Sequence, residues 1–360
     1  MSIPLTIALT YDLKSDYDCH AFTKEDLAEL DTEEGISAIE SALQNCGHKT
    51  VRVGNLTLLV AALSKNEHKN WDLVFNMCEG MHGSAREAQV PTLLEAYQIP
   101  CTFSDARVLG IIHDKALTKT VLQQHDLPTA AFTVIPANEH FPGWSASEWL
   151  SKLRGFRDHQ TFPVLFLKPN SEGSSKGVYD FSRVSTPEEA NASVKRLRSM
   201  SPKTDILVEE WLGGREFTVS LLGGQANAQV LGTMEAVWHA SSIGFWSCHL
   251  KNETVNGQGY TQPLVRSTDD PLVAQVESVA LQAWKLIGCR DAGRVDVRCK
   301  GSGADAKPYI IEINALAGLT PNYSQLPETA EHVGMKHHEL IETIVESARK
   351  RTVAQVQSIA

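Results

Sequence analysis

The sequence predicts an α/β protein. Short runs rich in β-branched and aromatic residues alternate with stretches whose apolar residues fall at helical spacing, and no repeat or low-complexity segment interrupts this alternation. The chain has 360 residues, of which 42% are hydrophobic and 21% charged, as in ordinary globular proteins. At about 100–200 residues per domain, this length suggests two or three domains.

The first 105 residues are expected to form a small doubly wound unit. Strands and helices should alternate in the order 5–11 (strand), 27–43 (helix, ending at Gly47), 50–53 (strand), 56–63 (helix), 72–76 (strand) and 86–97 (helix). Such a βαβαβα order is typical of a parallel sheet covered by helices.

Two further blocks follow. The second block should contain a helix over 114–125 and strands over 131–135, 162–169 and 206–211. The third block should contain strands over 216–222, 230–236, 294–298 and 309–314, with helices over 270–287 and 336–351.

Charge and composition exclude several classes of protein. The formal net charge is −10, whereas non-specific nucleic-acid binding requires a basic surface. No apolar run approaches the ~20 residues of a membrane span, and the first residues lack the pattern of a signal peptide. The seven cysteines include no CxxC pair, so zinc and redox motifs are not expected. We therefore expect a cytoplasmic protein that binds neither nucleic acid nor membranes.

The stretch 166–178 has a lysine at the end of a predicted strand and a Ser/Gly-rich loop directly after it. Gly173 and Gly177 allow the positive φ that such a loop requires, and successive backbone N–H groups in a turn can bind an anion. The loop, with Lys168 beside it, is a candidate phosphate site. A solvated β-hairpin turn is an equally good interpretation of this stretch taken alone.

Two later strands place charged side chains on one face. Residues two apart in a strand point to the same side, so Arg294 and Asp296 share a face, as do Glu312 and Asn314. Carboxylate and amide oxygens suit Mg²⁺ beside phosphate oxygens, and an arginine suits an oxyanion. The alternative is a salt-bridged sheet face, which we disfavour because both strands are otherwise apolar and buried charges need partners.

A third feature lies at 206–216, where an apolar strand ends in two glutamates and a Gly-Gly turn leads to another. The end of this strand could contact an adenine edge, and Glu216 could bind ribose hydroxyls. Without further context, solvated acids at a strand end are the better interpretation of Glu209 and Glu210.

Taken together, the three features resemble the ATP-grasp superfamily, in particular the D-alanine–D-alanine ligase family, from about residue 71 to 348. The matching stretches are DKALTK (114–119), 163–177 with EGSS, EEWLGGREFTV (209–219), GRVDVR (293–298) and EINALAGLTP (312–321). As a set they are highly specific. The resemblance implies an ATP-grasp fold with an N-terminal doubly wound domain (1–105), a central lid-bearing domain (106–213) and a C-terminal domain with the metal and substrate sites (214–360).

The resemblance also implies roles for individual residues. ATP is expected to contact Lys115, Lys168, Glu172, Gly173, Ser174, Ser175, Glu209, Glu210, Trp211, Leu212, Glu216 and Lys251. The metal, two Mg²⁺ ions with Mn²⁺ as an alternative, is expected on Asp296, Glu312 and Asn314. The implied catalytic residues are Arg294, Lys168, Ser174 and Gly318, and the implied substrate contacts are Glu79, His82, Arg294, Gly318 and Ser324. For His82, a loop histidine without a role is the competing interpretation.

The implied reaction is ATP-dependent formation of an amide or peptide bond. A substrate carboxylate attacks the γ-phosphate, an acyl phosphate and ADP form, and an amine then displaces phosphate. Such chemistry depends on positioning and charge neutralisation, and the acyl phosphate must be kept from water. The lid candidates are 170–177 and 238–259. The implied partners are a small carboxylate and a small amine, and the family suggests a homodimer.

The sequence departs from the family on the substrate side. The usual GGxSxEREVS segment, whose Glu helps hold an ammonium, is replaced by LTYDLKSDYD (9–18), where Asp12, Asp16 or Asp18 could substitute. HGxxGEDG is replaced by EGMHGSAREAQ (79–89), and the lid sequence YDYEAKY by FWSCHLKN (245–252). Because pocket contacts set specificity, we expect a first substrate other than D-alanine.

Two alternatives remain open. One is a true D-alanine–D-alanine ligase of cell-wall synthesis with an unusual N-terminus. The other is a nucleotide-binding scaffold that has lost catalysis. The second alternative is weakened by six retained polar residues, Lys115, Lys168, Arg294, Asp296, Glu312 and Asn314.

Overall fold

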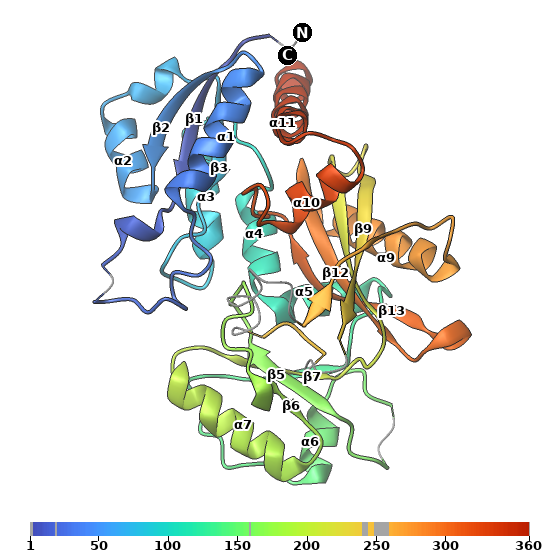
Figure 1. The fold of residues 1–360 in the computed structure, drawn as a ribbon. Helices are drawn as coiled ribbons and strands as arrows, with labels where there is room; N and C mark the ends of the chain where they lie inside the picture. The colour runs from blue at the N-terminus through green and yellow to red at the C-terminus, as the bar shows by residue number, and fades with distance from the viewer. Residues whose placement is uncertain (1–2, 19, 158–159, 240–243, 248–258, 360) are drawn as a thin grey trace.

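The structure is a computed structural model that describes residues 3–18, 20–157, 160–239, 244–247 and 259–359. These residues form three β-sheets with helices packed on them (Figure 1). None of the described helices is both long enough and apolar enough to cross a bilayer.

The first sheet is parallel, with the strand order β2-β1-β3. Its elements are β1 (Thr6–Tyr11), α1 (Glu33–Asn45), β2 (Lys49–Gly54), α2 (Leu56–Ser64), β3 (Leu73–Met77) and α3 (Gln89–Ala96), with 3₁₀ turns at Lys14–Asp16, Glu67–Asn70 and Arg86–Ala88. The predicted βαβαβα order is confirmed. The first helix begins later than residue 27, because Thr32 caps it by accepting a hydrogen bond from the Gly35 amide.

The second sheet is antiparallel, with the strand order β4-β7-β5-β6. Its elements are β4 (Phe132–Ile135), α6 (Ala146–Lys152), β5 (Leu165–Pro169), a 3₁₀ turn at Asp180–Ser182, β6 (Arg183–Val184), α7 (Pro187–Met200) and β7 (Ile206–Glu210). Helices α6 and α7 lie along one side of this sheet (Figure 1), with Trp149, Leu165 and Val194 in the shared core. The opposite face is left for the cleft described below.

The third sheet is also antiparallel and follows the order β10-β9-β8-β12-β13, with β11 paired to β9. Its strands are β8 (Glu216–Leu222), β9 (Gln229–Trp238), β10 (Tyr260–Thr261), β11 (Leu264–Val265), β12 (Ala292–Lys300) and β13 (Lys307–Asn314). The remaining helices are α4 (Ala106–His113), α5 (Lys115–Gln124), α9 (Pro271–Ile287), α10 (Gln325–His332) and α11 (His337–Ile359), with a 3₁₀ turn at Gly303–Asp305.

Four of these helices were not predicted from the sequence, namely α4, α6, α7 and α10. Helix α7 nevertheless has clear local signals, since Thr186 caps it and Pro187 occupies its first turn. The C-terminal helix α11 packs beside α1 (Figure 1), and Ile36, Leu340 and Ile344 lie in one core cluster. The two ends of the chain therefore share a core, and domain boundaries at 105 and 213 stay predictions.

Candidate active site

A cleft lies between the second and third sheets, with a volume of about 1040 Å³ that includes its open mouth. Strands β5 and β7 provide one wall and β12 and β13 the other, while the loop after β5 and residues 245–246 border it. The expected catalytic residue Arg294 lines this cleft. Most residues expected to bind ATP and metal also line it, namely Lys115, Lys168, Glu172, Ser174, Ser175, Glu209, Glu210, Trp211, Leu212, Glu216, Asp296, Glu312 and Asn314.

Two buried lysines share one buried glutamate on the floor of the cleft. The Glu209 carboxylate lies 2.8 Å from Lys119 Nζ and 2.7 Å from Lys168 Nζ. Burial raises the pKa of the Glu209 carboxyl, but the two lysines outweigh this effect and lower that pKa to about 2. Lys119 also donates a hydrogen bond to Thr129 Oγ1 at 2.7 Å. Two cations held around one anion leave a net positive charge, which suits a phosphate group.

A second lysine–carboxylate pair links the phosphate loop to the third sheet. Lys115 Nζ lies 2.9 Å from Glu312 Oε1 and donates a hydrogen bond to the backbone carbonyl of Glu172. Burial raises the pKa of the Glu312 carboxyl, yet Lys115 and Lys168 bring it down to about 2. Glu312 is therefore an anion at neutral pH.

The predicted polar face of β12 and β13 is present. In the antiparallel register, Arg294 stands opposite Asn314 and Asp296 opposite Glu312. Asp296 accepts hydrogen bonds from Asn314 Nδ2 at 3.2 Å and from Thr218 Oγ1 at 2.8 Å. The Arg294 guanidinium lies 3.4 Å from Asp296 Oδ2.

The donor set on this face fits a magnesium ion. Asp296, Glu312 and Asn314 offer carboxylate and amide oxygens, the hard ligands that Mg²⁺ prefers. Within the described ranges no cluster of three or more His, Cys, Asp or Glu side chains could hold a metal. Mg²⁺ at a nucleotide site commonly uses one or two carboxylates together with substrate phosphates, so two carboxylates and an amide are sufficient.

The predicted phosphate loop has the backbone of a turn that can cradle an anion. Ser174 and Ser175 adopt positive φ angles of 48° and 58°, and Gly177 follows at 70°. The prediction of a positive φ at Gly173 is wrong, because the left-handed residues of this turn are the two serines. Consecutive residues in this conformation turn their N–H groups toward one side. Because serine rarely adopts a positive φ, the loop needs support from neighbouring segments.

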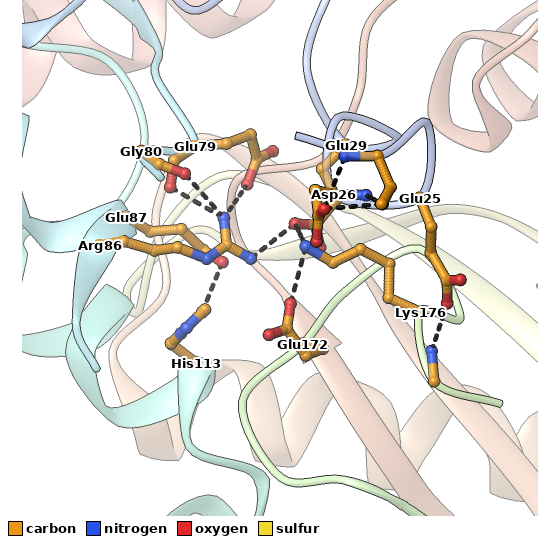
Figure 2. A network of polar contacts seen from close by, with 12 residues as sticks. Glu25, Asp26, Glu29, Glu79, Gly80, Arg86, Glu87, His113, Glu172 and Lys176 are labelled. Atoms are coloured by element: carbon orange, nitrogen blue, oxygen red, sulfur yellow. Dashed lines mark hydrogen bonds and ion pairs between the residues drawn. The ribbon is translucent and has the colours of Figure 1, made fainter. Parts of the chain in front are cut away.

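That support comes from the N-terminal part of the chain (Figure 2). Glu25 Oε1 accepts a hydrogen bond from the Gly177 amide at 2.9 Å. Lys176 Nζ lies 3.0 Å from Glu29 and 2.7 Å from Glu172. The loop is thus anchored to the N-terminal segment by two acids that precede α1, Glu25 and Glu29.

Arg86 extends this network away from the loop (Figure 2). Its guanidinium lies 2.7 Å from Glu29 Oε2 and donates at 3.0 Å to the Glu79 carbonyl oxygen. His113 contacts Glu87 at 2.8 Å beside it. Burial and the nearby acids Glu87 and Glu29 raise the pKa of the Glu79 carboxyl well above its usual value, although Arg86 lowers it.

The wall around the expected base and sugar positions is aromatic and charged. The rings of Phe166, Trp211 and Phe245 contact one another at centroid distances of 5.1–5.7 Å. Glu216, the expected ribose contact, lies 2.8 Å from Arg298 Nη1.

Several expected residues lie elsewhere in the described structure. Gly173, Glu79, His82, Gly318 and Ser324 are outside the lining of the cleft, and His82 is exposed. Gly318 and Ser324 lie against each other, because a Cβ on Gly318 would come within 2.8 Å of Ser324 Oγ. Their roles remain predictions. Lys251, and with it most of the lid candidate 238–259, lies outside the described residues.

Other cleft residues were not singled out from the sequence. The polar residues among them are Lys119, Lys176, Thr218, Arg298 and Gln325. Spacing could have pointed to two of them: Lys119 lies one helical turn after Lys115, and Arg298 follows Asp296 by two positions on the same strand. Gln325 accepts a hydrogen bond from Arg294 Nη1. These two residues are far apart in the sequence, so no local sequence pattern could have connected them.

Comparison with known proteins places the chain in a family. A family model described as "D-ala D-ala ligase C-terminus" matches residues 121–346. The chain belongs to the D-alanine–D-alanine ligase family. Family membership makes it an ATP-dependent, ADP-forming ligase, and the described sheets and cleft are those of an ATP-grasp fold.

Individual relatives agree with this family. The D-alanine–D-alanine ligase of Bordetella petrii is 30% identical over 278 residues, which is 77% of this chain and 76% of that protein. The "Uncharacterized protein y4sG" of Sinorhizobium fredii is 28% identical over 87% of each chain. Among solved structures, the D-alanine–D-alanine ligase of Bacillus anthracis has a TM-score of 0.71 at 20% identity and covers 98% of this chain and 99% of its own.

Proposed function

We propose that this D-alanine–D-alanine ligase relative joins a carboxylate to an amine through an acyl phosphate, and that its first substrate is not D-alanine. The observation that supports the second part of this proposal concerns the acids of the N-terminal segment that could replace the family's ammonium-binding Glu. D-Alanine carries an α-ammonium, and a buried ammonium needs an anionic partner.

The acids of the N-terminal segment have other partners. Asp12 is buried and accepts hydrogen bonds from Tyr17 Oη at 2.6 Å and from the Gly80 amide at 2.9 Å. Asp16 and Asp18 are exposed and accept from nearby backbone amides. Glu29, which lies closer to the phosphate loop, is paired with Arg86 and Lys176. These pairings favour a first substrate that does not depend on an ammonium–carboxylate contact of the D-alanine kind.

The residues of the cleft suit phosphoryl and acyl transfer. Bound ATP would supply the phosphoryl group, and Asp296, Glu312 and Asn314 are the residues that would hold Mg²⁺, whose charge would offset that of phosphate oxygens. Lys115 and Lys168 place positive charge beside the phosphate loop, and Arg294 is positioned to stabilise an oxyanion. The loop at 170–177 excludes water from an acyl phosphate that water would hydrolyse.

A second candidate is the synthesis of D-alanyl-D-alanine itself. It is favoured by several relatives that are named D-alanine–D-alanine ligases, including those from Bordetella petrii and Bordetella avium, both 30% identical to this chain. An inactive scaffold is disfavoured, because the cleft retains Lys115, Lys168, Arg294 and the oxygen donors in one space.

The test is a screen of phosphate release by the full-length protein with ATP and Mg²⁺. The panel contains D-alanine alone and then D-alanine paired with other amino acids, hydroxy acids and dicarboxylic acids, with products identified by mass spectrometry. We expect a pair containing another carboxylate to exceed D-alanine alone. Arg294→Ala serves as the control that assigns the activity to this cleft. Robust turnover of D-alanine alone to its dipeptide would make the second candidate correct.

A further inference from the structure

Gln325 is a cleft residue to which the family resemblance assigns no role, and it contacts Arg294. It is the first residue of α10 and lines the cleft together with Arg294 and Asp296. Arg294 Nη1 donates a hydrogen bond to Gln325 Oε1. Arg294 Nε is buried and has no acceptor among the residues that the structure describes. The amide of Gln325 is therefore a principal partner of this guanidinium.

The chemistry of the two side chains fixes which amide atom faces the arginine. Arginine only donates hydrogen bonds, so the facing atom of Gln325 must be the amide oxygen. An amide oxygen accepts this bond without carrying a negative charge. Gln325 therefore orients the guanidinium and leaves its positive charge uncompensated, whereas a carboxylate at this position would orient and neutralise it.

A carboxylate that could take over the guanidinium lies close by. Arg294 Nη2 is 3.4 Å from Asp296 Oδ2, somewhat longer than the about 2.7–2.9 Å of a charge-assisted hydrogen bond. Both side chains are shielded, with exposed fractions of 19% and 18%, and shielding from water strengthens their attraction. Without the bond to Gln325, the guanidinium would be free to close on this expected metal ligand.

Two buried hydroxyl groups fix the backbone of Gln325 relative to Arg294. Thr329 Oγ1 donates to the Gln325 carbonyl oxygen at 2.8 Å and accepts from Ser220 Oγ at 3.0 Å. Both hydroxyl residues are fully buried, and Ser220 on β8 stands opposite Arg294 on β12 in the antiparallel register. The start of α10 is thus tied to the strand next to the one that carries Arg294.

We infer that Gln325 is a positioning residue for Arg294, which it holds away from Asp296. Arg294 then keeps its positive charge for the reacting oxygen atoms, and Asp296 keeps an oxygen available for the metal. With a cation on Asp296, Arg294 would lose this carboxylate as a partner, and the neutral amide would remain. This inference rests on the proposed roles of Arg294 at an oxyanion and of Asp296 at the metal.

The test measures how strongly Mg²⁺ improves nucleotide binding. ADP is titrated into the full-length protein by calorimetry, once with Mg²⁺ and once with EDTA, and the ratio of the two Kd values gives the metal-dependent gain. Gln325→Met is similar in length but offers no amide oxygen. Its gain should be smaller than that of wild type by roughly fivefold or more, the loss expected for about one hydrogen bond. Its Kd in EDTA should stay near that of wild type.

Gln325→Glu separates positioning from charge. Its carboxylate still accepts a hydrogen bond from Arg294, so the metal-dependent gain should be retained. Because the carboxylate also neutralises the arginine, kcat for phosphate release should fall by roughly tenfold or more. A side chain that only supported the local fold would instead weaken ADP binding with and without Mg²⁺ alike.

Two more variants complete the design. Gln282→Met is the matched control, because Gln282 is exposed on α9 and donates its hydrogen bond to Ser278 of the same helix. Its metal-dependent gain and kcat should match those of wild type. Gln325→Ala also removes the amide oxygen, and it provides the same test if Gln325→Met does not fold.

An unchanged metal-dependent gain in folded Gln325→Met or Gln325→Ala would overturn this inference and leave the proposed function intact. An equal loss of the gain in Gln325→Glu would do the same, since the retained acceptor would then have no effect. Absence of any Mg²⁺-dependent gain in wild type would overturn the expected metal site as well.

Discussion

Gly173 lies against the carboxylate of Glu29, so closely that a Cβ atom built on Gly173 would stand 2.0 Å from Glu29 Oε1. Glu29 cannot simply move aside, because it is paired with Arg86 at 2.7 Å and Lys176 at 3.0 Å. This contact joins the phosphate loop to the N-terminal segment, and it explains the need for glycine at a position whose φ is not positive.

Substitution of Gly173 by alanine should displace Glu29 and loosen the phosphate loop. Because small displacements of positioning groups are costly in catalysis, we expect kcat/KM to fall by about 10–100-fold. Steady-state phosphate release measures this effect, and limited trypsin digestion should show faster cleavage after Lys176.

The matched control is Gly110→Ala in α4, where an added Cβ meets no atom within 4 Å. This change should stabilise the helix by about 0.5–1 kcal/mol without affecting the kinetics. Wild-type kinetics in Gly173→Ala would contradict the proposed role of the contact.

Lys119 should be important for stability as well as for the cleft. Lys119→Met removes one of the two cations that hold the Glu209 carboxylate ionised, and breaking a buried ion pair costs about 3–5 kcal/mol. Since Lys168 remains, we expect the low end of this range in urea unfolding. Lys300→Met breaks the more exposed pair with Glu210 and should cost at most about 1 kcal/mol. Equal losses in the two variants would show that burial of the Lys119 pair has no special energetic weight.

Arg294 should affect chemistry more than nucleotide binding. Arg294→Lys keeps a positive charge but loses the planar set of donors that contacts Gln325 and Asp296. Loss of an oxyanion-stabilising donor typically lowers kcat by about 10²–10³. Single-turnover phosphate release should show this decrease while the Kd for ADP stays near that of wild type. Unchanged turnover would refute the assignment.

Stability should depend on pH through Asp31. Burial and the neighbouring Asp12 raise the pKa of the Asp31 carboxyl from 3.8 to about 7. The folded protein therefore retains a proton that the unfolded chain releases, so the stabilising contribution is complete below about pH 4 and is lost as the pH rises through about 7.

Asp31→Asn removes this dependence. Relative to wild type, its Tm should be higher at pH 8 and about equal at pH 4, as measured by scanning calorimetry at both values. A Tm difference that does not vary with pH would contradict the raised pKa.

Much of the fold could be predicted because its signals are local. The three parallel strands of the first sheet and the strands β8, β12 and β13 are short runs rich in apolar and β-branched residues whose side chains alternate with the two-residue period of a strand, and each was predicted near its observed bounds. The shared face of Arg294 and Asp296 also follows from that period. Segment 27–32 was wrongly assigned to a helix, because Leu27 and Leu30 imitate helical spacing while Thr32 actually starts the helix.

By itself, the sequence determined the α/β class, the family and most of the residues that meet in the cleft, since these depend on local periodicity and on motifs that keep their order. Only the tertiary structure decided which charges neutralise one another. The sharing of Glu209 between two lysines, the pairing of Glu216 with Arg298 and the contact of Gly173 with Glu29 all join segments far apart in the chain. No local pattern specifies such pairs, because burial and the packing of the sheets determine which charges come within a few ångströms of one another.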